Sequence, residues 1–537
     1  MTITVGVHLG HDGGCAIMID GQVAIACAEE RLTRKKYANG WWTSFRYCLD
    51  AVELRLEDID LVVFSNAGPP LPEDFDAGLS RWTRRIRTAV VDHHVSHATS
   101  AFVLTGYPEA LVVVADAGGN DRSTETVFHV SQRHIDVVRK SDPGRLMAAG
   151  LGPTYEAFTN FLGFTDEESG KTMGLAAFGD PEAFDLELFE VSDDGFVESL
   201  LRHPHLWGVR ELGTRTGIEL GEPFPDSRSQ RAQDIAALIQ TRFTRAMKQM
   251  LEATKRLRPD LPIVLSGGTS LNCTANSWIR STGLDLFASP LGSDTGLALG
   301  NAAYGQFILD GFLHPLMNTS LRYGGVYSAG DIELALARVP QLTQAGPVRR
   351  GELQFRREDD PVSVAAQAIL DDQIVAWWQG RSELGPRALG GRSLVASPKS
   401  SDIRERMNRQ VKQREWFRPF GPSLLDSNAR SLLRDDPRHL RYMNEAPAVE
   451  QVAFDDLVAC VHVDGSARAQ TIPDESDDRY AALLRVLSTH GLPAVLNTSF
   501  NIQEPIVESP SDAISTFLRS EIDLLILGDY VCTRVVP

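Results

Sequence analysis

The stretch ITVGVHLGHDGGCAIMI, residues 3–19, decides the fold of this protein. Its apolar and β-branched residues are interrupted by the turn sequence His11-Asp12-Gly13-Gly14, which is typical of a β-hairpin. A second turn, Asp20-Gly21, adds one more strand. The predicted strands are Ile3–Leu9, Cys15–Ile19 and Gln22–Ala28. The chain is therefore expected to begin with three strands joined by tight turns.

A related pattern returns further along the chain. A predicted buried strand over Ala110–Ala115 leads into the glycine turn 116–120 and then into a strand over Thr124–Val130. The same order, a strand, an acidic glycine turn and a second strand, thus occurs twice. This repeat indicates a duplicated actin-like or sugar-kinase-like ATPase fold. Glycine turns also separate strands in unrelated folds, so the repeat alone leaves both interpretations open.

Length and local composition predict more than one domain. The 537 residues exceed one ordinary core. The stretch 341–361 mixes glycine, proline and charge blocks, which is typical of a linker. We place the domain boundary within it and expect domains over residues 1–345 and 346–537.

Charge and hydropathy disfavour several classes of protein. The net charge of −18, from 53 basic and 71 acidic residues, disfavours broad nucleic-acid binding. No apolar run is long enough to span a bilayer, and residues 1–6 lack the features of a signal peptide. The six cysteines contain no C-x-x-C pair. We therefore expect a cytoplasmic enzyme that binds neither nucleic acid nor membrane.

His93 and His97 form an H-x-x-x-H pair on a helix predicted over 92–104, with Asp92 as its N-cap. Positions i and i+4 lie on one helix face, about 5–6 Å apart at Cβ, so both imidazoles can reach one cation. Imidazole suits zinc, iron, copper or nickel, and carboxylates extend the choice to manganese. The alternative is a helix whose histidines only cap or pack.

Asp116 and Asp294 are the carboxylates that favour a metal site. Asp116 ends the buried strand at its glycine turn, where a carboxylate needs a partner. Asp294 lies between glycines in GSDTG, residues 292–296, before an apolar helix. Together with His93 and His97 they would form a four-ligand site with room for substrate oxygens.

Gly267 and Gly268 follow the predicted strand Pro262–Leu265 and precede a predicted helix. Such a turn exposes backbone N–H groups to which a nucleotide can bind, although an ordinary tight turn has the same sequence. The stretch 168–174 contains G-K-T but lacks the first glycine of a P-loop, so we reject a Walker A motif there.

A run of basic residues stands out in the second predicted domain. Glycine and proline between these residues would make the backbone rigid, and arginine forks and lysine bind phosphate. A solvated or ion-paired surface is the alternative. The basic residues are Arg381, Arg387, Arg392, Lys412, Arg414, Arg418 and Arg468. The stretch Asn497–Asn501 adds polar groups on a turn predicted after the strand Ala494–Leu496.

These motifs together resemble the O-carbamoyltransferase family of natural-product biosynthesis, which includes tobramycin, nodulation-factor, cephalosporin and ansamycin carbamoyltransferases. The matching stretches are residues 10–14, the AEERLTR of 28–34, and residues 93–102, 170–179, 267–275, 380–392, 414–422, 461–470 and 496–501. The resemblance implies an α/β fold. It implies an actin-like, duplicated RNase-H-like ATPase domain, similar to the tRNA threonylcarbamoylation ATPase, followed by a YrdC-like twisted α/β domain.

The resemblance also implies a reaction. ATP and carbamoyl phosphate would form carbamoyl-adenylate in the second domain, and the first would transfer the carbamoyl group to a hydroxyl of a small-molecule natural product. For the first step, the resemblance implies that carbamoyl phosphate and ATP are bound by Arg387, Lys412, Arg418, Arg468, Asn497 and Ser499. Arg387, Lys412 and Arg418 would also act in catalysis.

For the transfer step the resemblance implies that His11 takes the proton of the acceptor hydroxyl. It implies Fe(II), with manganese or zinc as alternatives, and magnesium with the ATP. The implied metal ligands are His93, His97, Asp116 and Asp294, and the implied nucleotide contacts are Gly267, Gly268 and Lys171.

Departures from the family pattern leave the acceptor open. Thr269-Ser270 replace the middle pair of G-G-V-A-L-N-C, and Ser169–Thr172 replaces the more usual E-G-K-V. Two alternatives stay open, a fused tRNA threonylcarbamoyladenosine-type enzyme and a non-catalytic module that binds ATP and metal. We expect a monomer or homodimer.

Overall fold

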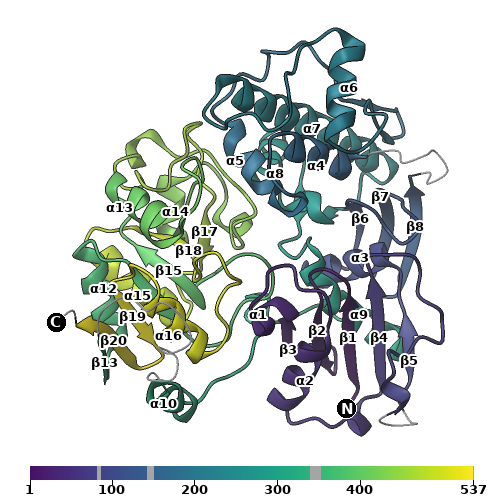
Figure 1. Ribbon diagram of the computed structural model, residues 1–537. Coiled ribbons are helices and arrows are strands. Elements are labelled where there is room, and N and C mark those ends of the chain that lie inside the picture. The colour runs from purple at the N-terminus through teal and green to yellow at the C-terminus, as the bar shows by residue number, and fades with distance from the viewer. Residues whose placement is uncertain (82–85, 142–149, 339–351, 536–537) are drawn as a thin grey trace. The chain divides into compact units, whose positions relative to one another are not determined.

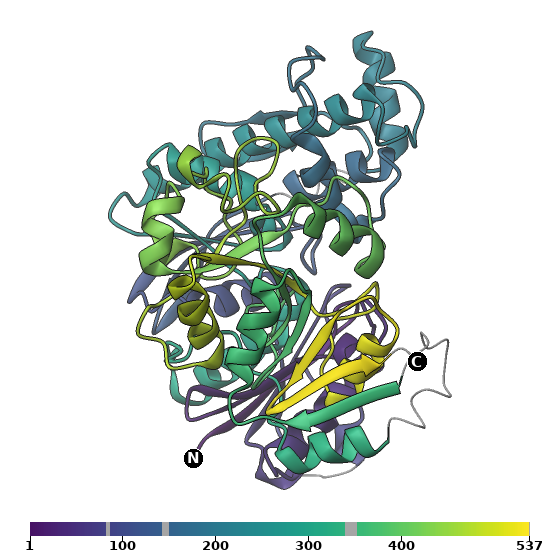
Figure 2. The same cartoon turned by 90° about the vertical axis from the view of Figure 1, so that its left-hand side faces the viewer.

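The computed structural model describes residues 1–81, 86–141, 150–338 and 352–535 (Figures 1 and 2). The chain forms two compact units. The first unit comprises residues 1–29 and 37–319, and the second comprises 30–36 and 320–537. The predicted boundary at 345 lies outside the described residues, whereas the chain passes from the first unit to the second between Thr319 and Ser320.

The first unit begins with a five-stranded sheet of order β3-β2-β1-β4-β5. The three N-terminal strands are antiparallel, as their glycine turns predict, and β4 and β5 continue parallel to β1. The strands are β1 (Ile3–Leu9), β2 (Gly14–Ile19), β3 (Gln22–Ala28), β4 (Leu61–Asn66) and β5 (Thr88–Val90).

The second sheet of this unit repeats the first. Its order is β12-β11-β6-β7-β8, with β6, β7 and β8 antiparallel and β11 and β12 parallel to β6. The strands are β6 (Glu109–Ala115), β7 (Glu125–Ser131), β8 (His134–Lys140), β11 (Ile263–Ser266) and β12 (Leu286–Ala288). Order and directions match the first sheet, which confirms the repeat predicted from the glycine turns.

Two helices, α3 (His93–Val103) and α9 (Leu297–Asp310), pack against each other in the first unit (Figure 1). A Cβ on Gly300 would lie 2.1 Å from the carbonyl oxygen of Ser96, so glycine permits this close approach. A Cβ on Gly6 would lie 2.0 Å from the carbonyl oxygen of Ala298, so α9 is equally close to β1. These contacts hold the N-terminal ends of both helices in place. The candidate site lies at these ends.

The remaining elements of the first unit include the long helix predicted over Arg231–Leu257, which runs from Gln230 to Leu257 behind a Ser229 cap. The helices are α2 (Trp42–Ala51), α4 (Leu151–Phe161), α5 (Ser169–Ala176), α6 (Leu206–Thr216), α7 (Gln230–Leu257) and α8 (Cys273–Ser281). A small hairpin joins β9 (Phe189–Val191) to β10 (Val197–Ser199).

The second unit is built on an eight-stranded mixed sheet of order β13-β20-β19-β14-β15-β18-β16-β17. The strands are β13 (Glu352–Arg357), β14 (Val375–Trp378), β15 (Arg392–Ala396), β16 (Gly421–Leu425), β17 (Gln470–Ile472), β18 (Ala494–Ser499), β19 (Leu524–Leu527) and β20 (Tyr530–Val535). The protein is thus a mixed α/β protein, as predicted.

Apolar side chains of the second unit are buried on both faces of its sheet. On β14, Val375 and Trp377 contribute to one core, and Ala376 and Trp378 to the other, because strand residues alternate between faces. The helices are α1 (Glu29–Thr33), α10 (Ala329–Ala337), α12 (Pro361–Leu370), α13 (Ser401–Arg406), α14 (Asp426–Leu432), α15 (Arg479–Thr489) and α16 (Pro510–Leu518).

Two local predictions are wrong here. The strand predicted over Ala494–Leu496 continues to Ser499, so residues 497–499 lie in β18 and not in a turn. Pairing of β18 with β15 holds these polar residues extended. The described part of the predicted linker contains β13, which pairs with β20, because cross-strand hydrogen bonding overrides a mixed composition.

Candidate functional site

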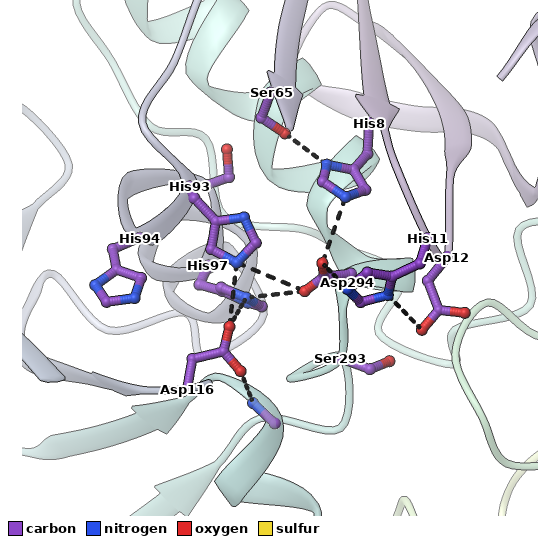
Figure 3. A network of polar contacts seen from close by, with 12 residues as sticks. His8, His11, Asp12, Ser65, His93, His94, His97, Asp116, Ser293 and Asp294 are labelled. Carbon is purple, nitrogen blue, oxygen red and sulfur yellow. Dashed lines mark hydrogen bonds and ion pairs between the residues drawn. The ribbon is translucent and has the colours of Figure 1, made fainter. Parts of the chain in front are cut away.

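Two histidines and two carboxylates converge in the first unit (Figure 3). Nε2 of His93 lies 3.1 Å from Oδ2 of Asp116 and 3.6 Å from Oδ1 of Asp294. Nε2 of His97 lies 3.4 Å from each of the same two oxygens. The four ligand atoms all lie within 4.8 Å of one another. The structure thus brings together the four residues predicted from sequence as metal ligands.

The N-terminus of α3 holds the histidines in place. The side chain of Asp92 caps the helix, accepting hydrogen bonds from the backbone N–H of His94 and Val95. Nδ1 of His93 lies 3.2 Å from the carbonyl oxygen of Asn66, which leaves Nε2 facing the carboxylates. A metal-binding imidazole is oriented by such a partner on its other nitrogen.

The charges in this cluster stabilise one another. Burial alone would lower the pKa of His97, but the nearby carboxylates of Asp116 and Asp294 outweigh it and raise that pKa to about 9. Burial would raise the pKa of both carboxyls, but the neighbouring histidines hold both pKa values below the usual range. Both carboxylates are therefore ionised, which is the form that a metal ligand requires.

The donor set fits a divalent transition metal. Imidazole nitrogens with carboxylate oxygens are the ligands that iron, manganese and zinc accept. Both side-chain nitrogens of His97 are buried and donate no hydrogen bond within the described residues. A buried polar atom of this kind needs a partner, and a metal ion facing Nε2 would supply one.

His94 does not belong to the cluster, although it lies between the two ligands in sequence. Figure 3 shows its ring away from Asp116 and Asp294. Its Nδ1 lies 2.8 Å from Oγ1 of Thr126. Burial, and then the neighbouring His93, lower the pKa of His94 to about 3, so this ring is neutral.

His11 and His8 approach the cluster from the first sheet (Figure 3). Nε2 of His11 lies 3.6 Å from Oδ2 of Asp294, and the ring is half exposed, with 52 % of its side chain accessible. His8, which sequence reasoning missed, is buried, and its Nε2 lies 3.4 Å from the same oxygen. The sequence signal was a histidine at the end of β1, before the glycine turn.

The turn that was predicted to bind a nucleotide makes a hydrogen bond within the protein. Gly268 donates its backbone N–H to Oδ1 of Asp116 at 3.0 Å, so this amide orients a candidate metal ligand. Gly267 has a φ of +83°, and a Cβ there would lie 2.3 Å from the carbonyl oxygen of Ala115. Lys171, on α5, has its Nζ 2.5 Å from Glu168 and over the ring of Phe164.

A cationic site lies in the second unit. Nζ of Lys412, 4 % exposed, donates to the carbonyl oxygen of Ser499 at 2.8 Å, to its Oγ at 3.2 Å, and to both oxygens of Asn501. Burial, followed by the charges of Arg414 and Arg418, lowers the pKa of Lys412 well below its usual value. An anion bound nearby would relieve this repulsion.

Other predicted residues surround Lys412. Burial and the charges of Arg418 and Arg468 lower the pKa of Arg414, so these arginines lie close together. Asn497 donates to the carbonyl oxygen of Ala388, next to Arg387, at 3.1 Å. Its Oδ1 is buried and accepts no hydrogen bond among the described residues.

Arg381 and Arg392 were predicted with this basic group, but their contacts are structural. Arg392 is fully buried, stacks 4.0 Å from the ring centroid of Trp378, and donates to the carbonyl oxygens of four residues. Arg381 donates to the carbonyl oxygen of Gly324. These contacts distinguish Arg381 and Arg392 from the arginines around Lys412.

Comparison with known proteins shows the family of this chain. Family models described as carbamoyltransferase N-terminus and carbamoyltransferase C-terminus match residues 73–303 and 366–534. The nodulation protein NolNO of Sinorhizobium fredii is 31% identical, over 98% of this chain and 79% of that protein. The chain belongs to the carbamoyltransferase family. It is therefore an enzyme of the transferase class.

Other relatives of this carbamoyltransferase include the nodulation protein NolO of Bradyrhizobium diazoefficiens, 33% identical over 83% of this chain and 79% of that protein. The 3'-hydroxymethylcephem-O-carbamoyltransferase of Streptomyces clavuligerus is 28% identical over 99% of both chains. The crystal structure of full-length HypF, phosphate- and nucleotide-bound, matches 57% of this chain and 56% of that chain at 11% identity. Its TM-score of 0.36 does not establish a shared fold.

Among the helices in the described part of the chain, none is long and apolar enough to cross a membrane.

Proposed function

We propose that this carbamoyltransferase is an ATP-dependent O-carbamoyltransferase that modifies a hydroxyl of a small-molecule natural product. The observation that carries the proposal is that each unit holds its own site, four convergent metal-ligand residues in the first and buried cations in the second. An anion site suits carbamoyl phosphate and ATP, and a site rich in imidazole and carboxylate suits the transfer of an acyl group.

The first step belongs to the second unit, for which we propose the YrdC-like fold. Hydrolysis of carbamoyl phosphate would give carbamate and phosphate, and the carbamate oxygen would attack the α-phosphorus of ATP, releasing pyrophosphate. Lys412, Arg387, Arg418 and Arg468 would neutralise the phosphoryl charge. The unsatisfied Oδ1 of Asn497 could accept a hydrogen bond from the carbamoyl NH₂.

Ser499 supports the same step, because its Oγ accepts from Lys412 and donates to Oδ1 of Asn501 at 2.8 Å. This chain of hydrogen bonds orients the ammonium group. Gln470 and Ser423 fix the amide of Asn497 from the other side, through hydrogen bonds of 3.1 and 2.9 Å.

The second step belongs to the first unit. The acceptor oxygen would attack the carbamoyl carbon, AMP would leave, and the hydroxyl proton would pass to a base. His11 is the candidate base, because its ring is half exposed beside Asp294. His93, His97, Asp116 and Asp294 would hold the metal, for which we propose Fe(II) over manganese or zinc. A bound metal would supply Lewis-acid polarisation of an oxygen in the site.

We also propose that Gly267, Gly268 and Lys171 contact the nucleotide in the first unit. Magnesium would accompany the ATP. We further propose a monomer or homodimer in the cytoplasm, with no nucleic-acid or membrane partner. The six cysteines, none of them in a disulfide, support a reducing compartment.

The test measures the two steps separately on the full chain. Pyrophosphate should be released from ATP only when carbamoyl phosphate is added, and mass spectrometry across hydroxylated natural products should find a gain of one carbamoyl group. His11→Ala should keep pyrophosphate release and lose transfer. Equal loss of both steps would contradict the division of labour, and carbamoylation of tRNA instead of a small molecule would contradict the acceptor class.

A further inference from the structure

A short segment from near the N-terminus belongs to the second unit. Residues 30–36, which include most of α1, group with residues 320–537 and not with the rest of the N-terminal chain. Arg34 anchors this segment by donating to the carbonyl oxygens of Pro505 and Ile506 at 2.6 and 2.7 Å. Its Nε also lies 3.6 Å from Asp512.

Arg31 is the most buried charged side chain of this segment, at 3 % exposed. Its Nη2 donates to the carbonyl oxygen of Gly385 at 2.7 Å, and its Nε lies 3.4 Å from Oε1 of Glu30. Its Nη1 is buried and donates no hydrogen bond within the described residues. Burying such a donor without an acceptor is unfavourable, which indicates that an acceptor is missing.

Arg31 lies against a loop of the proposed anion site. Gly385 lies two residues before Arg387, and Ala388 accepts from the side chain of Asn497 at 3.1 Å. Arg31 therefore contacts the same loop that carries Arg387. The other end of the segment also lies near this site, because Lys36 contributes to lowering the pKa of Lys412.

We propose that Arg31 is an anion-binding residue of the second unit, whose Nη1 donates to a phosphoryl oxygen of the substrate held beside Arg387. The proposal rests on the proposed function, since it adds a ligand to the same carbamoyl phosphate and ATP site. A guanidinium presents several N–H groups in one plane, so Arg31 can hold Gly385 with one nitrogen and a phosphoryl oxygen with another.

This assignment gives the N-terminal segment a role in the proposed anion site. The AEERLTR stretch, residues 28–34, brings two arginines to loops of the second unit that lie far away in sequence. Arg34 fixes the segment to one loop, and Arg31 then lies against the other. The phosphoryl group could belong to carbamoyl phosphate or to ATP, and the two sources are separated by kinetics.

The experiment measures pyrophosphate release by the full chain, with the KM for carbamoyl phosphate and the KM for ATP determined separately. Arg31→Ala should raise one of the two by about 10- to 100-fold, as expected for loss of a charge-assisted hydrogen bond. The KM that rises identifies the source of the phosphoryl group. Added guanidinium ion should restore part of the activity, which a purely structural defect would not allow.

Lys35→Ala is the matched control, because it removes an exposed positive charge from the same segment and should leave both KM values unchanged. If Arg31→Ala does not fold, Arg31→Lys carries the test. It keeps the charge but loses the fork, so one KM should rise while the melting temperature is retained. Unchanged KM values in a folded Arg31 variant would overturn the proposal.

Pyrophosphate release by the wild-type chain separates an error in the role of Arg31 from an error in the proposed function. If the wild-type chain releases no pyrophosphate with ATP and carbamoyl phosphate, the proposed function itself is wrong. If the wild-type chain releases it and the Arg31 variants match the wild type, only the role of Arg31 is wrong.

Discussion

The backbone amide of Gly268 lies 3.0 Å from Oδ1 of Asp116 and donates to it, so a turn after β11 orients a carboxylate at the end of β6. With Oδ1 held in this way, Oδ2 faces His93 and His97. The adjacent Gly267 makes the turn possible, because its φ is +83° and a Cβ there would overlap the carbonyl oxygen of Ala115.

Gly267→Ala should therefore weaken metal binding without touching a ligand. The added Cβ would displace the turn and the amide that holds Asp116, and loss of such an outer partner costs about 10- to 100-fold in metal affinity. Competition with a chromogenic chelator measures the affinity. Gly283→Ala is the control, because Gly283 also has positive φ, +95°, but open space around it. Equal affinities for the two variants would contradict this role.

The metal content of purified protein should depend on His93 and His97 but not on His94. His97→Ala removes one of the four proposed ligands and should leave far less than one ion per chain, measured by elemental analysis after dialysis. His94→Asn keeps a polar group opposite Thr126, and its neutral ring points elsewhere, so full metal content is expected. Loss of metal in both variants would mean that helix packing, and not ligation, controls the site.

Anion binding should be coupled to proton uptake at Lys412. Burial and neighbouring arginines lower the pKa of this lysine in the unliganded protein, and a bound phosphate would raise it. Between the two pKa values binding takes up a proton, so affinity should fall as pH rises. Calorimetry with phosphonoacetamide, an unreactive analogue of carbamoyl phosphate, in two buffers of different ionisation enthalpy measures the uptake. Lys412→Met should abolish it, and unchanged uptake would assign the proton to another group.

Arg392 should matter for stability rather than for substrate binding. Its guanidinium is fully buried on Trp378 and satisfies several carbonyl oxygens, so Arg392→Met leaves these acceptors unpaired. We expect a loss of about 3 kcal/mol or more in the free energy of unfolding. Arg409→Met, at an exposed ion pair with Glu405, should cost less than about 0.5 kcal/mol. Denaturant unfolding measures both, and similar values would contradict the structural role.

Local patterns in the sequence predicted much of the first unit. The hairpin strands at residues 3–28 follow from alternation and glycine turns, and Asp92 caps α3 as predicted. The i, i+4 spacing of His93 and His97 places both on one helix face. These features depend on residues that are neighbours in sequence, so composition and spacing are enough to predict them.

The polar stretch 497–501 shows where local reasoning failed. Its composition suggests a turn, but pairing with β15 and β16 extends the strand to Ser499. Arg392 and Arg418 looked equivalent in the basic run, yet only the sheet determines that one lies under Trp378 and the other near Lys412. Cross-strand partners are separated widely in sequence, and no short window contains them.

The sequence by itself determined the repeated strand pattern, the four candidate metal ligands and the cations of the candidate anion site. Only the tertiary structure decided that His8 lies beside Asp294, that Gly268 orients Asp116, and that Arg31 belongs to the second unit. The physical reason is that each of these contacts joins segments far apart in the chain. Such contacts are set by the packing of sheets and helices, which periodicity along the chain does not encode.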